Sequence, residues 1–210
     1  MLEGAKCPML TYSAAGGDAE LKAENVYLTG EGVHFEAVYG AERVQTELAI
    51  PGIFSVYNAL GIIAAGLSLG ISLEKCAHAL SSAKGVKGRM ERVPTDGDYS
   101  IIIDYSHKPD ALEKVLKTLR PITRGRLIAL FGCGGDRDRG KRPIMGAIAA
   151  DNADFVIVTS DNPRTEEPMA IIEEIVEGLE DKQTPYTVIC DRIEAIGWAI
   201  DNSRPGDVIL

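Results

Sequence analysis

The chain has 210 residues, of which 45% are hydrophobic and 25% are charged, a balance that is typical of one or two globular cores and excludes a disordered chain. Its 31 acidic residues outnumber the 22 basic ones, and the basic residues form no stripe, so we expect no nucleic-acid partner. No apolar run is long enough to span a bilayer and the first residues lack a signal-peptide pattern, which predicts a cytoplasmic protein without a membrane partner.

The first part of the chain predicts a small antiparallel meander followed by two helices. Polar and apolar residues alternate along three segments that glycine-containing turns separate. An alanine-rich stretch then predicts a helix that Gly70 ends, and Ser72 is suited to cap the next helix. The predicted strands cover residues 23–28, 32–39 and 44–50, the predicted helices cover 59–69 and 72–83, and residues 84–88 form a linker.

From Arg89 onward, strands and helices alternate, which predicts a doubly wound, Rossmann-like α/β domain. Pro109 in the first turn of one helix, with basic residues near its end, is typical of helix limits. We therefore divide the chain into residues 1–88 and 89–210. The predicted strands of the second part are 100–104, 127–131, 155–159, 187–190 and 208–210, and its helices are 109–119, 143–152, 168–179 and 192–201.

Both ends of the chain indicate a piece of a longer protein. The last predicted strand is still apolar at Leu210. A meander with two helices also leaves apolar faces that need a partner sheet. We expect further chain on both sides.

The cysteines indicate neither a metal site nor a redox site. They lie far apart, form no Cys-x-x-Cys pair and have no histidines at ligand spacing, so no metal site is predicted. Cys133 lies in a glycine-rich loop, where a small thiol is more often a packing residue than a nucleophile. The four are Cys7, Cys76, Cys133 and Cys190.

Two arginine-containing loops carry most of the functional information. Gly132–Arg142 follows one apolar strand, and Asp161-Asn162-Pro163-Arg164 follows the next. Parallel strands bring such loops to one ligand crevice, and arginine forks suit carboxylates and phosphates. Alone, the second loop is more often a turn than a site. However, this second loop follows a strand end and would lie beside Arg137. There its acid, amide and guanidinium groups can bind the ammonium and carboxylate of an amino acid.

A P-loop is the alternative interpretation of the first loop. Gly135 to Lys141 has the Walker A spacing, but Arg142 stands where serine or threonine should hold magnesium. The acidic residues Asp136 and Asp138 also oppose a phosphate cradle. We favour a loop whose Arg137 points into the crevice while Lys141 and Arg142 begin a helix.

A third polar loop, Asp104–Asp110, leaves another strand. Its acid, hydroxyl and imidazole could meet a nucleotide or a reacting group, although a plain polar loop with Asp110 near a helix start is the alternative. The other two histidines, His34 and His78, are interpreted as ordinary surface or core residues.

Taken together, five segments resemble the Mur ligase family over nearly the whole chain. No single segment is specific for this family, but the order and spacing of all five are. Ser55 departs from the asparagine that is usual there. The segments are Gly52–Leu60, Gly88–Arg92, Asp104–Asp110, Phe131–Pro143 and Asp161–Arg164.

The resemblance implies that residues 1–88 end a central ATPase domain and that residues 89–210 are most of a C-terminal domain. It further implies an ATP-dependent, ADP-forming amide ligase that adds meso-diaminopimelate to UDP-N-acetylmuramoyl-L-alanyl-D-glutamate in peptidoglycan biosynthesis. ATP and Mg²⁺ would be its cofactors, its partners would be these small molecules, and it would be a monomer. The P-loop and the lysine carbamate that helps hold magnesium would precede Met1, and a glutamate that helps grip the amino acid would follow Leu210.

The same resemblance assigns binding roles to residues of this chain but no catalytic residue and no metal ligand. Arg164 would bind the far carboxylate of meso-diaminopimelate, which lysine lacks. The implied ATP contacts are Asn58 for adenine and Arg89, Asp104 and His107 for ribose and phosphates. The implied diaminopimelate contacts are Arg137, Asp161, Asn162, Pro163 and Arg164.

Two alternatives stay open. One is a related ligase with another substrate, either a lysine-adding ligase or a folylpolyglutamate synthase. The other is a non-catalytic α/β module that binds an acidic metabolite and regulates a partner. Only the ligases require a Walker A sequence upstream of this chain.

Because the implied P-loop precedes Met1, we predict that the purified 210-residue chain does not turn over ATP. The measurement is ADP formation with ATP and magnesium, compared with a heat-killed control. ADP formation above that control would contradict the prediction.

Overall fold

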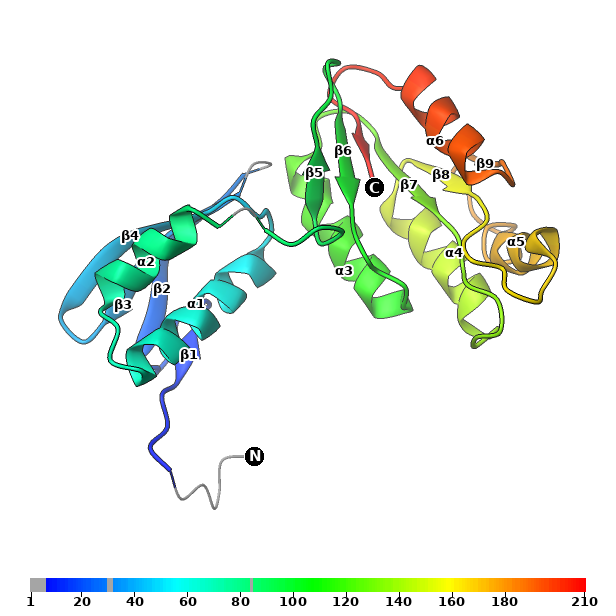
Figure 1. The fold of residues 1–210 in the computed structure, drawn as a ribbon. Coiled ribbons are helices and arrows are strands. Elements are labelled where there is room, and N and C mark those ends of the chain that lie inside the picture. Colours follow the sequence, from blue (N-terminus) through cyan, green and yellow to red (C-terminus); the bar gives the residue numbers. More distant parts are fainter. Residues whose placement is uncertain (1–6, 30–31, 84) are drawn as a thin grey trace. The chain divides into compact units, whose positions relative to one another are not determined.

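The computed structural model describes residues 7–29, 32–83 and 85–210, which form two compact units (Figure 1). The units are Met1–Gly85 and Val86–Leu210, whereas the boundary predicted from the sequence lies between residues 88 and 89. Lys84, in the predicted linker, lies outside the described residues.

The first unit has a four-stranded sheet in the order β1-β2-β3-β4. Its last three strands are the predicted antiparallel meander, while the short β1 pairs parallel to β2 and was not predicted. The strands are β1 Tyr12–Ser13, β2 Leu21–Leu28, β3 Val33–Tyr39 and β4 Glu42–Leu48.

Helices α1 (Ile53–Ser68) and α2 (Leu73–Ser81) pack on one face of this sheet. Alternate residues along the strands, such as Val33 and Phe35, share one buried core with residues of both helices. Helix α1 begins earlier than predicted, and its first turn includes a 2.9 Å bond from Ser55 N to Gly52 O. Ser72 caps α2, as predicted.

The second unit has a six-stranded sheet in the order β5-β6-β10-β7-β8-β9. All neighbours are parallel except the edge pair β5 and β6. The predicted doubly wound α/β domain is confirmed, with the addition of β5 at its edge. The strands are β5 Glu91–Val93, β6 Ser100–Ile103, β7 Leu127–Phe131, β8 Phe155–Val158, β9 Tyr186–Val188 and β10 Val208–Ile209.

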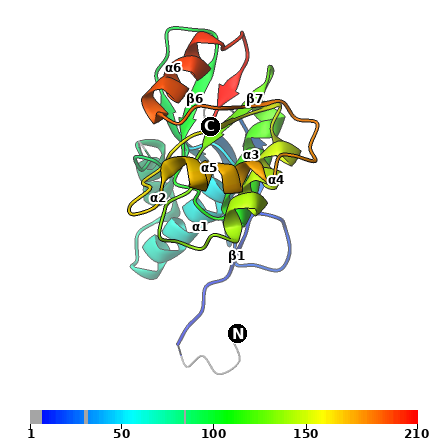
Figure 2. The same cartoon turned by 90° about the vertical axis from the view of Figure 1, so that its right-hand side faces the viewer.

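Helices cover both faces of the second sheet (Figure 2). Three of them, α3 (Pro109–Leu119), α4 (Lys141–Asn152) and α5 (Pro168–Val176), pack in that order on one face. A 3₁₀ turn, Arg120–Ile122, follows α3. Helix α6 (Arg192–Asp201) packs Ala195 and Ala199 against residues of β7, β8 and β10 on the other face.

The last strand, β10, enters the sheet between β6 and β7. Asp207, just before β10, is 2% exposed and accepts hydrogen bonds from Arg126 N (2.7 Å) and Arg126 Nη2 (2.6 Å) at the start of β7. Burial of the Asp207 carboxylate opposes its ionisation, but bonds from Arg126 and from Arg204 N overcome this, and the net effect lowers its pKa. This ion pair joins segments 81 residues apart at the end of the sheet opposite the loops described below.

We predict that Asp207→Asn lowers the free energy of unfolding of the second unit by about 2–4 kcal/mol, because it leaves the Arg126 donors facing an amide. Urea unfolding followed by Trp198 fluorescence would measure this change. Trp198 is the single tryptophan of the chain and stacks on Phe155 within this unit. Exposed Asp201, at the end of α6, gives the matched control Asp201→Asn, which should leave the midpoint unchanged.

Candidate functional site

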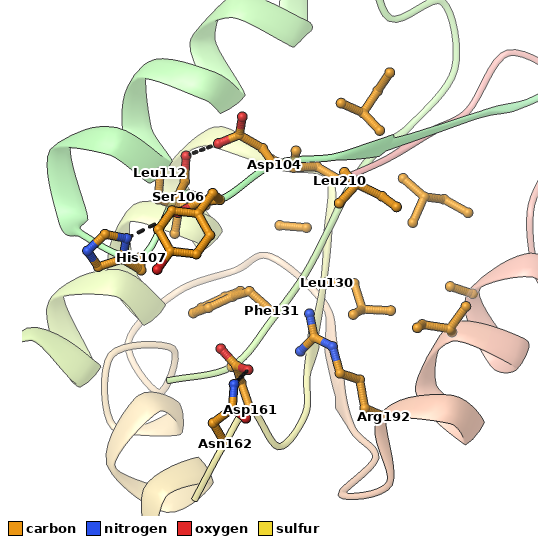
Figure 3. Close-up of a pocket in the computed structure, with 18 of the residues that line it drawn as sticks. Asp104, Ser106, His107, Leu112, Leu130, Phe131, Asp161, Asn162, Arg192 and Leu210 are labelled. Atoms are coloured by element: carbon orange, nitrogen blue, oxygen red, sulfur yellow. Dashed lines mark hydrogen bonds between the residues drawn. The ribbon is translucent and has the colours of Figure 1, made fainter. Parts of the chain in front are cut away.

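A pocket of about 770 Å³ lies in the second unit, where β6, β7, β10 and α6 meet (Figure 3). In an open α/β sheet, ligands bind at the carboxyl ends of the strands where the chain reverses its winding direction, and β10 is inserted at such a place. Strand and helix residues, including Ile101, Leu130 and Ile200, give the pocket an apolar wall. Its polar lining residues are Asp104, Ser106, His107, Arg137, Lys141, Asp161, Asn162, Arg164 and Arg192.

The loop after β6 forms one side of the pocket. The Asp104 carboxylate accepts hydrogen bonds from Met90 N (3.0 Å) and from the Ser106 hydroxyl. His107 Nδ1 lies 3.1 Å from Tyr105 O, which fixes the imidazole ring at the end of the loop. The bonds from Met90 N and the Ser106 hydroxyl hold the Asp104 carboxylate at the pocket edge.

Arg89 belongs to this side as well, although it does not line the pocket. Its guanidinium carbon lies 4.7 Å from the centre of the Tyr105 ring, a cation–π contact. The structure therefore brings together Arg89, Asp104 and His107, three of the predicted ATP contacts. The fourth, Asn58, is exposed on α1 in the other unit, so the structure leaves its relation to these residues open.

The loops after β7 and β8 form the opposite side and are bonded to each other. Gly135 N donates to Asn162 O (3.1 Å), and Arg164 Nη1 donates to Gly135 O (2.6 Å). Thr165 Oγ1 adds a 2.7 Å bond to Asp136 Oδ1. The two predicted arginine loops thus behave as one structural element.

Both loops contain backbone conformations that residues other than glycine rarely adopt. Asp136, Asn162 and Arg164 have φ values of 52°, 47° and 53°, in the left-handed region. Such residues persist where the surroundings over-determine them, and they cluster at functional sites. The bonds between the two loops supply that constraint here.

Two glycines allow the loops to approach so closely. A Cβ on Gly135 would lie 1.8 Å from Pro163 O, and one on Gly132 would lie 2.2 Å from Thr159 O. Both neighbours are backbone atoms, so a side chain at either glycine would force the backbone to shift. Of the predicted contacts, Pro163 therefore meets Gly135 through its backbone and does not line the pocket, whereas Arg137, Asp161, Asn162 and Arg164 do.

Arg142 begins a helix, as predicted, but the sequence interpretation gave it no further role. It is fully buried and bonds the carboxylates of Glu166 and Glu174. Its hydrogen bonds, with that of Asp136 N, lower the pKa of Glu166 from 4.5 to about 2. The ion pair therefore adds stability above pH 4.5, and this contribution is lost as the pH falls through about 2. The sequence did contain a signal for this ion pair. Arg142 stands where a Walker A sequence has serine or threonine, and Glu166 and Glu174 follow the next strand.

Two further basic residues of the pocket were not predicted as ligand contacts. Lys141 Nζ donates a 2.7 Å bond to His107 O and so links α4 to the loop after β6. Arg192, the first residue of α6, donates to Ser160 O (3.3 Å), and Figure 3 shows its guanidinium directed toward Leu130. Lys141 lies in a motif segment but was interpreted only as a helix start, and Arg192 lies outside all five segments.

Cys133 fits the packing interpretation. It is buried, its sulfur lies 3.7 Å from that of Met145, and burial raises the pKa of its thiol to about 11. A protonated thiol is a poor nucleophile.

Within residues 7–29, 32–83 and 85–210, no group of three or more His, Cys, Asp or Glu side chains is placed to hold a metal ion. The same residues include no helix with the length and apolar character needed to cross a membrane.

Residues 88–210 match the Mur ligase glutamate ligase domain, and residues 1–66 match the Mur ligase middle domain. The chain belongs to the Mur ligase family.

Its similarity extends to individual members of this family. The UDP-N-acetylmuramoyl-L-alanyl-D-glutamate–2,6-diaminopimelate ligase 1 of Clostridium acetobutylicum is 47% identical over 194 residues, which cover 91% of this chain and 40% of that protein. The corresponding ligase of Clostridioides difficile is 43% identical over 209 residues, which cover 100% of this chain and 43% of that protein. The chain thus spans about two fifths of the length of these relatives.

Solved structures show the same fold. A UDP-N-acetylmuramoyl-L-alanyl-D-glutamate–2,6-diaminopimelate ligase superposes with a TM-score of 0.68 at 36% identity, covering 95% of this chain and 41% of the other. A UDP-N-acetylmuramate-alanine ligase from Thermotoga maritima superposes with a TM-score of 0.73 at 22% identity, covering 96% and 43%, and supports the fold alone.

We predict that Gly135→Ala separates the two arginine loops and destabilises the second unit by roughly 1–3 kcal/mol, because its Cβ would overlap Pro163 O. Hydrogen exchange at the backbone amides of residue 135 and Asp136 should become faster. Gly197, on α6, has no atom within 4 Å of the position that a Cβ would take, so Gly197→Ala is the matched control. Equal exchange in both variants would contradict the prediction.

Proposed function

We propose that the complete protein containing this chain is an ATP-dependent, ADP-forming amide ligase. In this proposal it adds meso-diaminopimelate to UDP-N-acetylmuramoyl-L-alanyl-D-glutamate during peptidoglycan biosynthesis. The observation that supports the proposal most is the pair of hydrogen-bonded arginine loops after β7 and β8. These loops and the loop of Asp104 and His107 line the same pocket. The 43–47% identity to ligases of that name supports the choice of substrate.

The reaction joins a carboxylate to an amine, and a carboxylate is a poor electrophile. Transfer of the γ-phosphoryl group of ATP to the D-glutamate carboxylate gives an acyl phosphate and ADP. The amine of meso-diaminopimelate then attacks the acyl carbon, loses a proton, and expels inorganic phosphate. A protein accelerates such steps mainly by positioning the reactants and by stabilising charge.

Residues on the two sides of the pocket suit these two tasks. Asp104, His107 and Arg89 are the proposed contacts to the ribose and phosphates of ATP, and Asn58 in the first unit is the proposed adenine contact. Across the pocket, Asp161 and Asn162 offer oxygen atoms to an ammonium group. Arg137 and Arg164 offer guanidinium groups to carboxylates.

In this proposal magnesium is bound as the partner of ATP. None of its ligands is assigned to the part of the chain that the structure describes. We further propose a cytoplasmic monomer whose partners are ATP, the UDP-sugar dipeptide and meso-diaminopimelate.

Selection of meso-diaminopimelate over lysine follows from the charge of Arg164. One of its N–H groups is bonded to Gly135 O, and the rest of the fork can bind the carboxylate that lysine lacks. A hydrogen bond to a charged group contributes about 1.5–3 kcal/mol, or roughly ten- to a hundredfold in affinity.

We predict that Arg164→Ala in the complete protein lowers kcat/KM for meso-diaminopimelate by about 10- to 100-fold and lowers kcat/KM for L-lysine much less, because lysine lacks the carboxylate that Arg164 would bind. The measurement is ADP release with ATP, magnesium and the UDP-sugar dipeptide, with each amino acid as acceptor.

The matched control is Arg124→Ala, since Arg124 is exposed just before β7, at the opposite end of the sheet, and should not affect either acceptor. Wild-type release that depends on lysine would refute the role of the arginine loops. Release with neither acceptor would favour the non-catalytic binding module.

A further inference from the structure

We propose that Arg142 is a positioning residue for the amino-acid substrate, because its buried ion pairs set the relative placement of the two loops that carry Arg137 and Arg164. This inference rests on the proposed function, since it concerns the same substrate. Arg142 does not line the pocket, so its effect on the substrate would pass through the loops.

The guanidinium of Arg142 holds three segments together from within α4. Its Nη1 and Nη2 donate to the two carboxylate oxygens of Glu166, at 2.9 Å and 2.7 Å, in a bidentate fork. Nη1 also donates to Glu174 on α5 (2.8 Å). Nη2 reaches Gly134 O in the loop after β7 (3.4 Å).

Glu166 transmits this placement to the arginine loops. Its Oε1 accepts a 2.6 Å bond from Asp136 N, the residue before Arg137. Its own backbone N–H donates to Pro163 O (3.0 Å), the residue before Arg164. Glu166 thus holds the backbone beside both arginines of the proposed substrate site, through its carboxylate at Asp136 and through its backbone N–H at Pro163, and Arg142 fixes the carboxylate.

The ion pairs of Arg142 are better explained by geometry than by stability. A buried charged pair adds little stability compared with apolar residues of the same volume, but it fixes the relative positions of the segments that it joins. Arg142 Nε is also buried without a hydrogen-bond partner among the described residues. The side chain therefore gives up one donor while its two Nη groups reach both glutamates.

Small errors in this register should affect the substrate strongly. Displacement of a bound reactant by about 1 Å can cost about 100-fold in rate. The left-handed backbone at Asp136 and Arg164 makes both loops prone to relax once the constraint is lost.

The test is Arg142→Lys in the complete protein, which keeps the charge but removes the planar fork. We expect KM for meso-diaminopimelate to rise at least about tenfold while KM for ATP stays within about twofold. Hydrogen exchange at the amides of Gly135 and Asp136 should become faster.

Arg126→Lys is the matched control, because Arg126 forms a second ion pair of the same unit with buried Asp207, at the opposite end of the sheet. It should lower Tm but leave KM for meso-diaminopimelate and the exchange of the loop amides unchanged. Should Arg142→Lys fail to fold, Glu174→Gln removes one charged acceptor and should produce the same changes to a smaller extent.

An unchanged KM for meso-diaminopimelate, with unchanged loop exchange, would overturn the positioning role even if Tm falls. Wild-type protein that fails to use meso-diaminopimelate would instead refute the proposed function. In that case the exchange measurement alone would decide whether Arg142 places the loops.

Discussion

A buried arginine that binds two carboxylates organises the functional end of the second unit. Arg142 lies in the first turn of α4, yet its partners Glu166 and Glu174 come 24 and 32 residues later in the chain. Because an unpaired charge in this position would be strongly unfavourable, the loop after β8 and helix α5 must close over α4 together. The placement of the pocket's arginines depends on this closure.

Around this ion pair, backbone geometry provides a second level of constraint. Gly132 and Gly135 permit carbonyl groups of the neighbouring strand and loop to occupy the space of a side chain. The left-handed residues Asn162 and Arg164 then turn the chain sharply beside the pocket. The site is therefore held rigidly on the side where specificity for an amino acid would be expressed.

The opposite end of the sheet is held by a similar ion pair with a different consequence. The ion pair of Asp207 and Arg126 joins the start of β10 to the start of β7, and backbone pairing places β10 between β6 and β7. The insertion creates the reversal of winding at which the pocket opens. One ion pair thus ties β10 to β7 at the far end of the sheet, and the other holds the loops at the pocket end.

Most elements could be predicted from the sequence because their signals are local. The apolar runs of β7 and β8, the proline at the start of α3 and the polar loops after the strands each need only neighbouring residues. The sequence also placed Arg137, Asp161, Asn162 and Arg164 together, since parallel strands end at one edge of a sheet. It did not predict β5, because a three-residue edge strand with two charged residues has no distinctive pattern.

The alternation of strands and helices, the family resemblance and the loops that line the pocket could thus be predicted from the residues alone. The position of β10, the contacts of Lys141 and Arg192 at the pocket and the pairing of Arg142 with two glutamates became apparent in the folded chain. These features depend on contacts between residues 24 to 81 positions apart. Such contacts are selected by burial and charge compensation in the folded chain, so residue types along the sequence can name partners such as Arg142 and Glu166 but do not pair them.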